Sequence, residues 1–190
     1  GDQLLYVLAR ARLAAGELRG PVVGTVMSNL GLEVALAQLG VPFLRSAVGD
    51  RHVLQLLRAH GGILGGEFSG HLLCLDKTTT GDGLIVALQV LAVMQATGST
   101  LAELAAGMQK FPQQMINVRV ARRFDAASDP GVAAAIGRVE QALGKRGRGV
   151  LRASGTEPVI RIMVEGEDAQ AVSRHATTLA EAVQAAAPAA

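Results

Sequence analysis

Residues 21–66, PVVGTVMSNLGLEVALAQLGVPFLRSAVGDRHVLQLLRAHGGILGG, decide the fold of the first part of this chain. Short apolar runs at residues 21–27, 42–47 and 63–66 alternate with segments of helical character at residues 29–39 and 50–60. Strands that alternate with helices predict an α/β layered domain with a mixed, largely parallel sheet. In such a sheet, ligands bind in the loops at the ends of the strands.

The sequence on either side of this stretch predicts further helices. Asp2 is expected to cap a helix that runs to Ala15, and Asp82 is expected to cap a helix that begins at Leu84. Thr100 and Glu103 have the spacing of a capping box. The apolar stretch at residues 84–96 is too short to span a bilayer, so we interpret it as a buried helix.

The pattern changes after Phe111-Pro112. Strands are expected at residues 115–120, 149–153 and 158–165. Two helices are expected from apolar residues that recur every three or four positions: Val132, Ile136, Val139 and Leu143 in one, Val172, Ala176, Leu179 and Val183 in the other. The order β-α-β-β-α predicts a small two-layer α+β domain on an antiparallel sheet. We therefore expect two domains, at residues 1–114 and 115–190.

Composition limits the class of protein. Hydrophobic residues make up 49% of the 190 residues and charged residues 18%, which is typical of a globular chain with a core. The net charge is only +2, and the basic run at residues 145–148 has no aromatic residues within it, so neither nucleic acid nor membrane is an expected partner. The single cysteine, Cys74, lies in an apolar run, so we expect a buried thiol of raised pKa and a reducing cytoplasm. No leader is evident, and the start at Gly1 suggests a piece of a longer protein.

One polar bend has the composition of a phosphate pocket. The stretch Leu151–Arg161, LRASGTEPVIR, places Arg152 and Arg161 on either side of a turn that contains Ser154, Gly155 and Thr156. Forked guanidinium groups, hydroxyls and backbone N–H groups all suit a doubly charged oxyanion. The alternative is a polar hairpin turn with two solvated arginines.

A second polar bend suits sugar hydroxyls. In Gly65–His71, GGEFSGH, glycines flank Glu67, so that Glu67, Ser69 and His71 can be exposed together. The alternative is a flexible glycine-rich loop with a solvated glutamate. Two further polar loops, at residues 48–52 and 76–83, are explained by helix caps at Asp50 and Asp82, although a ligand role at residues 76–83 stays open.

Signatures of several other chemistries are missing from the sequence. It contains no dinucleotide-binding glycine motif, no Gly-Lys-Ser/Thr phosphate loop and no nucleophile elbow. Its histidines, His52, His60, His71 and His175, do not have the spacing of metal ligands. We therefore expect neither a metal site nor a catalytic nucleophile within these residues.

Taken together, these motifs resemble a known family. Residues 66–71 are similar to the sugar-recognition loop of the α-D-phosphohexomutase superfamily, and residues 152–158 are similar to its C-terminal phosphate-binding loop. Further matches in the same order lie at residues 24–29, 48–51, 76–83 and 164–168, and the combination resembles the phosphoglucosamine mutase branch of bacteria.

The resemblance implies an activity that this chain cannot complete alone. Members of the branch interconvert glucosamine 6-phosphate and glucosamine 1-phosphate through glucosamine 1,6-bisphosphate, for UDP-N-acetylglucosamine and peptidoglycan precursor synthesis. The catalytic phosphoserine belongs to the first of four domains and the Mg²⁺ loop to the second, whereas this chain resembles the third and fourth. The full-length protein could be a homodimer, and the fragment alone is expected to be inactive.

The resemblance also assigns binding roles. It places Glu67 and Ser69 on the sugar, with His71 as a weak candidate for proton transfer. It assigns the phosphate to residues of the C-terminal loop and the strand after it, namely Arg152, Ser154, Gly155, Thr156 and Arg161. Asp50 and Arg51 stand where relatives that act on glucose or mannose phosphates carry Lys or His, which fits an aminosugar substrate.

Three alternatives remain open from the sequence. The full-length protein could act on glucose or mannose phosphates. It could also be a non-catalytic phosphosugar-binding module. Finally, the basic residues from Lys145 to Arg152 could bind nucleic acid, which predicts binding that weakens steeply with salt.

Overall fold

The computed structural model describes residues 1–122, 124–154 and 157–188. The chain forms two compact units, Gly1–Lys110 and Phe111–Ala190. None of the helices in the described ranges is long and apolar enough to cross a membrane.

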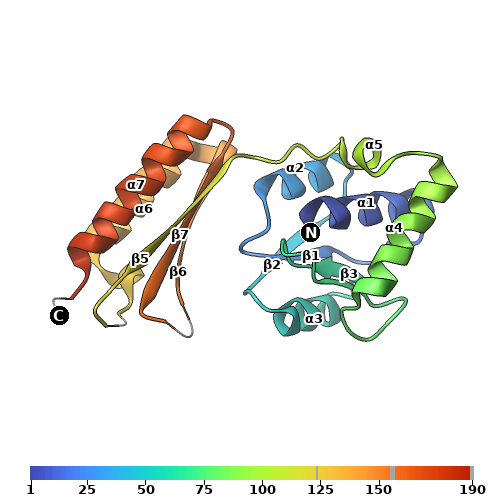
Figure 1. Cartoon of the computed structure of the whole chain (residues 1–190), viewed down its shortest axis with the longest axis horizontal. Coiled ribbons are helices and arrows are strands. Elements are labelled where there is room, and N and C mark those ends of the chain that lie inside the picture. Colours follow the sequence, from blue (N-terminus) through green and yellow to red (C-terminus); the bar gives the residue numbers. More distant parts are fainter. Residues whose placement is uncertain (123, 155–156, 189–190) are drawn as a thin grey trace. The chain divides into compact units, whose positions relative to one another are not determined.

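The first unit is built on a four-stranded mixed sheet (Figure 1). Its strands are β1 (Val22–Thr25), β2 (Phe43–Ser46), β3 (Leu64–Gly66) and β4 (Leu72–Cys74), in the order β2-β1-β3-β4. β1 pairs in parallel with β2 and β3, whereas β4 is antiparallel to β3. This confirms the mixed, largely parallel sheet that the alternation of residues 21–66 predicts.

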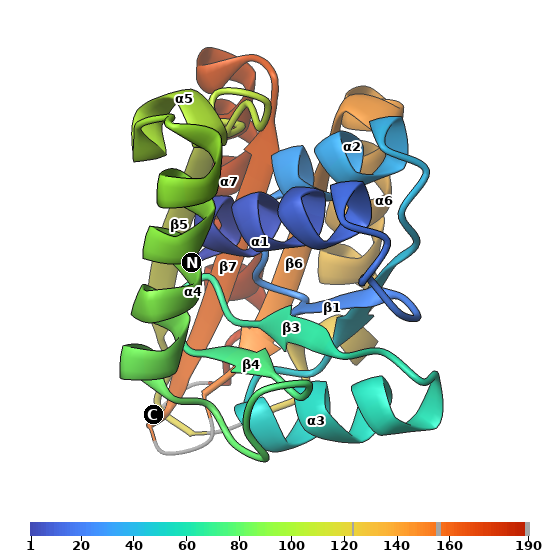
Figure 2. The same cartoon turned by 90° about the vertical axis from the view of Figure 1, so that its right-hand side faces the viewer.

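Helices cover both faces of this sheet. Val22 and Leu72 pack in one core with α1 (Asp2–Ala14), α2 (Leu30–Gln38), α4 (Gly83–Thr97) and α5 (Leu101–Ala105). Their strand neighbours Val23 and Leu73 form the other core with α3 (Asp50–Ala59). Successive strand residues point to opposite faces, so each strand serves both cores. Figure 2 shows α1 and α3 on opposite sides of β3.

Burial sets the chemistry of the cysteine in this unit. Cys74, on β4, is a free thiol with no exposed surface. Desolvation is the main reason that the pKa of the thiol is raised, and the nearby Arg12 guanidinium opposes that shift. The expectation of a buried thiol with a raised pKa is confirmed.

The structure corrects one predicted cap and confirms two others. Asp2 does not cap α1, because it is itself the first helical residue, and its carboxylate instead accepts a hydrogen bond from the Asn29 backbone N–H at 2.9 Å. Burial is the main cause that raises the pKa of Asp2. Asp82 caps α4, and Thr100 forms the capping box with Glu103, whose pKa the backbone hydrogen bond at Thr100 lowers.

The prediction that residues 84–96 form a buried helix is wrong in one respect. The helix is present, but Leu84, Leu88 and Leu91 are 79%, 63% and 57% exposed. Only Val86 and Val90 of α4 are fully in the core. The sequence could not show which side faces outward, because apolar residues fill nearly every position of the run and follow no helical period.

Replacing Asp82 by Ala is expected to destabilise the first unit by about 1 kcal/mol. Its carboxylate accepts hydrogen bonds from the N–H groups of Leu84 at 2.9 Å and Ile85 at 3.1 Å, which otherwise have no intrahelical partner. Urea denaturation measures the loss. An Asp82→Ser variant keeps an acceptor and is expected to recover most of it, and equal losses in both variants would contradict the capping role.

The second unit is a three-stranded antiparallel sheet in the order β5-β7-β6, formed by β5 (Gln113–Arg119), β6 (Gly147–Ala153) and β7 (Val159–Gly166). The helices α6 (Pro130–Leu143) and α7 (Ala169–Ala186) pack on one face (Figure 1). Short 3₁₀ turns occupy Ala126–Ser128 and Gly144–Arg146. The predicted order β-α-β-β-α is confirmed.

The predicted apolar spacing decides how these helices pack. The four apolar residues of α7 at this spacing, Val172, Ala176, Leu179 and Val183, are all buried. In α6, Val132 and Val139 are buried, whereas Ile136 and Leu143 are only partly buried. The spacing therefore predicts every buried apolar position tested in α7. In α6 it predicts the face that points to the core, although two of the four residues are only partly buried.

Candidate functional site

Three loops of the first unit lie at one edge of its sheet. β1, β2 and β3 run in parallel, so the loops that follow Thr25, Ser46 and Gly66 start at the same edge. This edge is formed by the carboxyl ends of the strands, where ligands bind in open α/β sheets. The sequence motifs at residues 48–52 and 66–71 both lie here.

The loop from Gly66 to His71 is a tight turn that closes on itself. The Glu67 N–H donates to the His71 carbonyl and the Gly70 N–H donates to the Glu67 carbonyl, each at 3.0 Å. Gly70 has a φ of +101°, a conformation that favours glycine. Ser69 lies near the tip of this turn and is exposed. The local bonding of the backbone holds the carboxylate, the hydroxyl and the imidazole on one short turn.

Side chains join this turn to two other loops. One carboxylate oxygen of Glu67 accepts a hydrogen bond from the Gly49 N–H at 3.1 Å. The His71 Nε2 lies 3.4 Å from an Asp50 carboxylate oxygen. The His71 ring also lies so close to Gly81 that a methyl group there would overlap it. The structure therefore brings together the motifs at residues 48–52, 66–71 and 76–83, which lie on three different loops.

The predicted cap of α3 by Asp50 is wrong. Gly49 occupies the N-cap position with a φ of +120°, and Asp50 is the first helical residue, with one carboxylate oxygen accepting from the Arg51 N–H at 2.7 Å. Asp50 and Arg51 are both exposed, and the Arg51 guanidinium donates to the His52 ring at 3.3 Å. Both charged groups are accessible to a ligand at the start of the helix.

Two arginines that the sequence did not single out hold the neighbouring loops. The Arg45 guanidinium donates to the carbonyls of Thr25 and Ser28 at 3.0 and 2.7 Å, which fixes the loop after β1. Arg12 is buried and forms an ion pair with Asp76 at 3.1 Å, which anchors the start of the loop at residues 76–83. Neither residue lies in a motif, so only the folded chain shows these roles.

In the second unit, Arg152 and Arg161 face each other across two paired strands. They are direct partners in the antiparallel register of β6 and β7, so their side chains leave the same face of the sheet. Asn117 of β5 is in register with Arg161, which extends the row. Because Ile160 and Ile162 pack toward the helices, this row lies on the opposite face, which carries no helix of this unit.

The charge on this row is not compensated within the described residues. Neither Arg152 nor Arg161 forms an ion pair with any carboxylate placed by the structure, and the buried Arg152 Nε has no hydrogen-bond partner there. Like charges directly opposite each other destabilise a sheet. Farther along the same strands, Arg148 donates to the buried Glu165 at 2.6 Å. Among the described residues, Arg152 and Arg161 have no such partner, which suits an anionic ligand.

Ser154 closes the turn beside these arginines. Its N–H donates to the Val159 carbonyl at 2.8 Å, and its hydroxyl oxygen accepts from the Glu157 N–H at 3.3 Å. Ser154 is buried, so it shapes the loop as well as offering a hydroxyl. The predicted phosphate-binding residues Gly155 and Thr156 lie outside the described residues.

No cluster of at least three His, Cys, Asp or Glu side chains that could hold a metal ion occurs in the described part of the chain. His52, His60, His71 and His175 are described residues and belong to no such cluster.

Comparison with known proteins places both units. Residues 1–111 match the family model of phosphoglucomutase/phosphomannomutase, alpha/beta/alpha domain III, and residues 115–182 match that of the C-terminal domain. The phosphoglucosamine mutase of Alkalilimnicola ehrlichii is 58% identical over 97% of this chain, and that of Methylococcus capsulatus is 56% identical over 96%. In both cases the match covers 41% of the relative, so the chain spans less than half the length of these relatives.

Solved structures show the same fold. The N-acetylphosphoglucosamine mutase of Aspergillus fumigatus in complex with GlcNAc-6P and magnesium has a TM-score of 0.80 and 21% identity, covering 99% of this chain and 44% of its own. A phosphoglucomutase/phosphomannomutase family protein of Burkholderia thailandensis has a TM-score of 0.70 and 19% identity, covering 99% of this chain and 42% of its own. The two family models, which match residues 1–111 and 115–182, show that the chain belongs to the phosphoglucomutase/phosphomannomutase family.

Proposed function

We propose that this chain provides the sugar-binding and phosphate-binding parts of an enzyme that interconverts glucosamine 6-phosphate and glucosamine 1-phosphate. The observation that carries the proposal is the pair Arg152 and Arg161, directly opposite each other on β6 and β7 with no described carboxylate between them. The names of the relatives from Alkalilimnicola ehrlichii and Methylococcus capsulatus support the choice of an aminosugar phosphate.

The arginine pair suits the phosphate that does not react. Two forked guanidinium groups can donate several charge-assisted hydrogen bonds to one phosphate. Both start from paired strands, so the bound phosphate would be held in a fixed place. Phosphoryl transfer depends on positioning and charge stabilisation, which is what such a clamp supplies. We assign Ser154, Gly155 and Thr156 to the same phosphate.

The loop of Glu67, Ser69 and His71 suits the sugar hydroxyls. Glu67 accepts and Ser69 can both donate and accept, so the loop can bind vicinal hydroxyls of a sugar in either of two orientations. A mutase of this kind must bind its sugar both ways round, because each end has to meet the same phosphorylating group. Asp50 and Arg51, at the start of α3, complete the proposed sugar site.

The remaining steps of the reaction require parts of the protein that this chain does not contain. We assign the phosphoserine and the Mg²⁺ loop to domains that precede residue 1 in the full-length protein, with glucosamine 1,6-bisphosphate as the intermediate. The product would feed UDP-N-acetylglucosamine and peptidoglycan precursor synthesis in the cytoplasm. A homodimer of the full-length protein is part of the same proposal, as is the inactivity of the 190-residue chain alone.

An amide chemical-shift titration with glucosamine 6-phosphate tests the proposal. We expect saturable shifts at residues 66–71 and 152–161, larger than those caused by free glucosamine or by inorganic phosphate. If the 190-residue chain shows none, the titration is repeated on the full-length protein, where closure by the other domains is possible. Absence of these shifts in both proteins would rule out the assigned site.

Replacing Asp50 by Asn in the full-length protein is expected to reduce its preference for glucosamine 6-phosphate over glucose 6-phosphate. The Asp50 carboxylate is exposed and lies beside His71, so it can accept from the ammonium group of the aminosugar. Loss of one charged hydrogen bond corresponds to about 1.5–3 kcal/mol, or about a tenfold to hundredfold change in the ratio of the two kcat/KM values.

Measuring kcat/KM with both sugars checks this prediction. Glu140→Gln removes an exposed carboxylate of α6, outside these loops, and is the control. If the Asp50→Asn enzyme keeps the same preference, Asp50 does not contact the aminosugar. The proposed phosphate clamp of Arg152 and Arg161 would not be affected by that result.

A further inference from the structure

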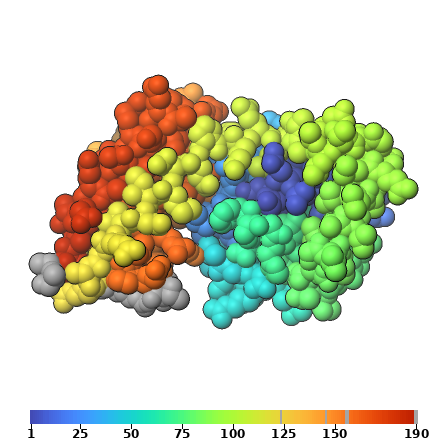
Figure 3. Space-filling model, viewed as in Figure 1, coloured from blue at the N-terminus to red at the C-terminus, as the bar shows by residue number. Residues whose placement is uncertain are grey.

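The solvent-facing side of α4 is unusual for a surface helix. The helix runs for 15 residues without a single charged side chain. Leu84, Leu88 and Leu91 are 79%, 63% and 57% exposed, and they recur at helical spacing along one side, which we call the α4 apolar face. Figure 3 shows this green segment at the surface.

Another helix of the same chain shows what an ordinary exposed side looks like. On α7 the outward positions are mostly polar or charged and carry no large apolar side chain; the polar ones include Ser173, Arg174, Thr177, Thr178, Glu181 and Gln184. Both helices bury an apolar stripe, but only α4 also exposes one. Scattered exposed leucines need no explanation, whereas a row of them on one helix is typical of an interaction surface.

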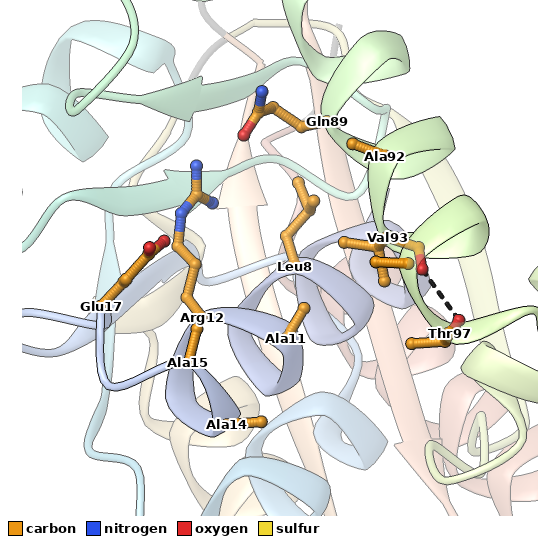
Figure 4. Close-up of a pocket in the computed structure, with 11 residues that line it drawn as sticks. Leu8, Ala11, Arg12, Ala14, Ala15, Glu17, Gln89, Ala92, Val93 and Thr97 are labelled. Atoms are coloured by element: carbon orange, nitrogen blue, oxygen red, sulfur yellow. Dashed lines mark hydrogen bonds between the residues drawn. The ribbon is translucent and has the colours of Figure 1, made fainter.

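A groove of about 470 Å³ runs between α1 and α4 (Figure 4). Its walls are mainly apolar, with Ala11 and Ala14 from α1 and Ala92 and Ala96 from α4. Ala92 lies one helical turn beyond Leu88 and directly follows Leu91, and Ala96 lies one turn beyond Ala92, so the groove borders the α4 apolar face. A row of leucines beside a shallow alanine-lined groove is a surface against which another folded segment can pack.

The chemistry of this surface disfavours a lipid bilayer. Helices that bind a membrane surface place Lys or Arg on their polar side, and α4 has none. It is also shorter than the roughly 20 residues that a membrane span requires. A protein partner remains, and the length of the relatives indicates which one.

We infer that the α4 apolar face and the groove beside it are covered, in the full-length protein, by the part of the polypeptide that precedes residue 1. The unit that carries α4 matches the third domain of its family, and the matched relatives are more than twice as long as this chain. The preceding domains are therefore a partner that is always present at high effective concentration. This inference rests on family membership and on α4, and it is independent of the proposed substrate.

Thiol labelling of the full-length protein tests this inference. Cys74, the single cysteine of this chain, is fully buried, so a cysteine placed at Leu88 or Leu91 is read without interference from it. Leu88→Cys and Leu91→Cys are expected to react with a maleimide at least tenfold more slowly in the full-length protein than in the 190-residue chain. Peptide mapping by mass spectrometry locates each label. Ala37→Cys, at an exposed position of α2, is the matched control and is expected to react equally in both.

Each alternative occupant gives a different result. Equal, fast labelling at Leu88 and Leu91 in both proteins would show that the face stays open and would overturn the inference. Slow labelling that becomes fast on dilution of the 190-residue chain would show that a second copy covers the face, and would also overturn it. A tenfold slowing that appears at Ala37 as well would overturn the assignment to this face.

Discussion

Removing either arginine of the facing pair is expected to weaken phosphosugar binding by about 1.5–3 kcal/mol, or about tenfold to hundredfold in Kd. Arg152 and Arg161 are direct cross-strand partners, so both guanidinium groups can reach one phosphate from the same face of the sheet. Arg152→Ala and Arg161→Ala each remove one fork of the proposed clamp. Isothermal titration of the full-length protein with glucosamine 6-phosphate measures the change.

The same substitutions are expected to weaken binding but not to lower the free energy of unfolding of the ligand-free protein. Two like charges opposite each other in an antiparallel pair cost about 0.2–1 kcal/mol when no anion lies between them. Relieving that repulsion should leave the ligand-free protein unchanged or slightly more stable in urea. A loss of affinity together with retained or increased stability distinguishes a binding role from a structural one.

Two controls separate charge from geometry. Arg161→Lys keeps the charge but loses the fork, so its affinity is expected to lie between those of the wild type and Arg161→Ala. Arg174→Ala removes an exposed arginine of α7 and should change neither affinity nor stability. Unchanged affinity in both Arg152→Ala and Arg161→Ala would contradict the phosphate clamp.

Much of the fold was predictable because local chemistry decides it. The strands within residues 21–66 are short apolar runs between helical segments, and the core stripe of α7 repeats at a regular spacing with no competing apolar side. The predictions were wrong where the same type of residue can occupy two different environments, such as a leucine in the core or on the surface. In α4, apolar residues occupy nearly every position, so the sequence does not show which side faces outward. Asp2 has the chemistry of a cap, but its carboxylate accepts from the N–H of Asn29, which is distant in sequence.

The site was predictable only in part for a related reason. Motif composition identified Glu67 and His71 as polar groups on one loop and Asp50 as a polar group on another. Their contacts, Glu67 with Gly49 and His71 with Asp50, join loops that follow different parallel strands. Such contacts depend on the strand order, with β1 between β2 and β3, which no local pattern encodes. Arg12 and Arg45 escaped notice because their partners are equally distant.

Replacing Leu179 by Ala is expected to destabilise the second unit by about 3 kcal/mol, the largest stability effect among these predictions. Leu179 is fully buried on α7 and belongs to the core formed with Val132 and Ile162. Ala leaves a cavity that this well-packed core can only partly fill, and the lost contacts add to the lost hydrophobic transfer energy. Hydrogen exchange of the amides in β7 and α7 measures the loss directly.

The effect should be confined to one unit, because each hydrophobic core has its members within a single unit. Amides of β1 and β3 are expected to keep their exchange rates in Leu179→Ala. Glu181→Ala, an exposed change two residues farther along the same helix, is the control and should leave exchange in both units unchanged. Faster exchange in β1 and β3 to the same extent as in β7 would show that the two units open together, and the account of two separate cores would then be wrong.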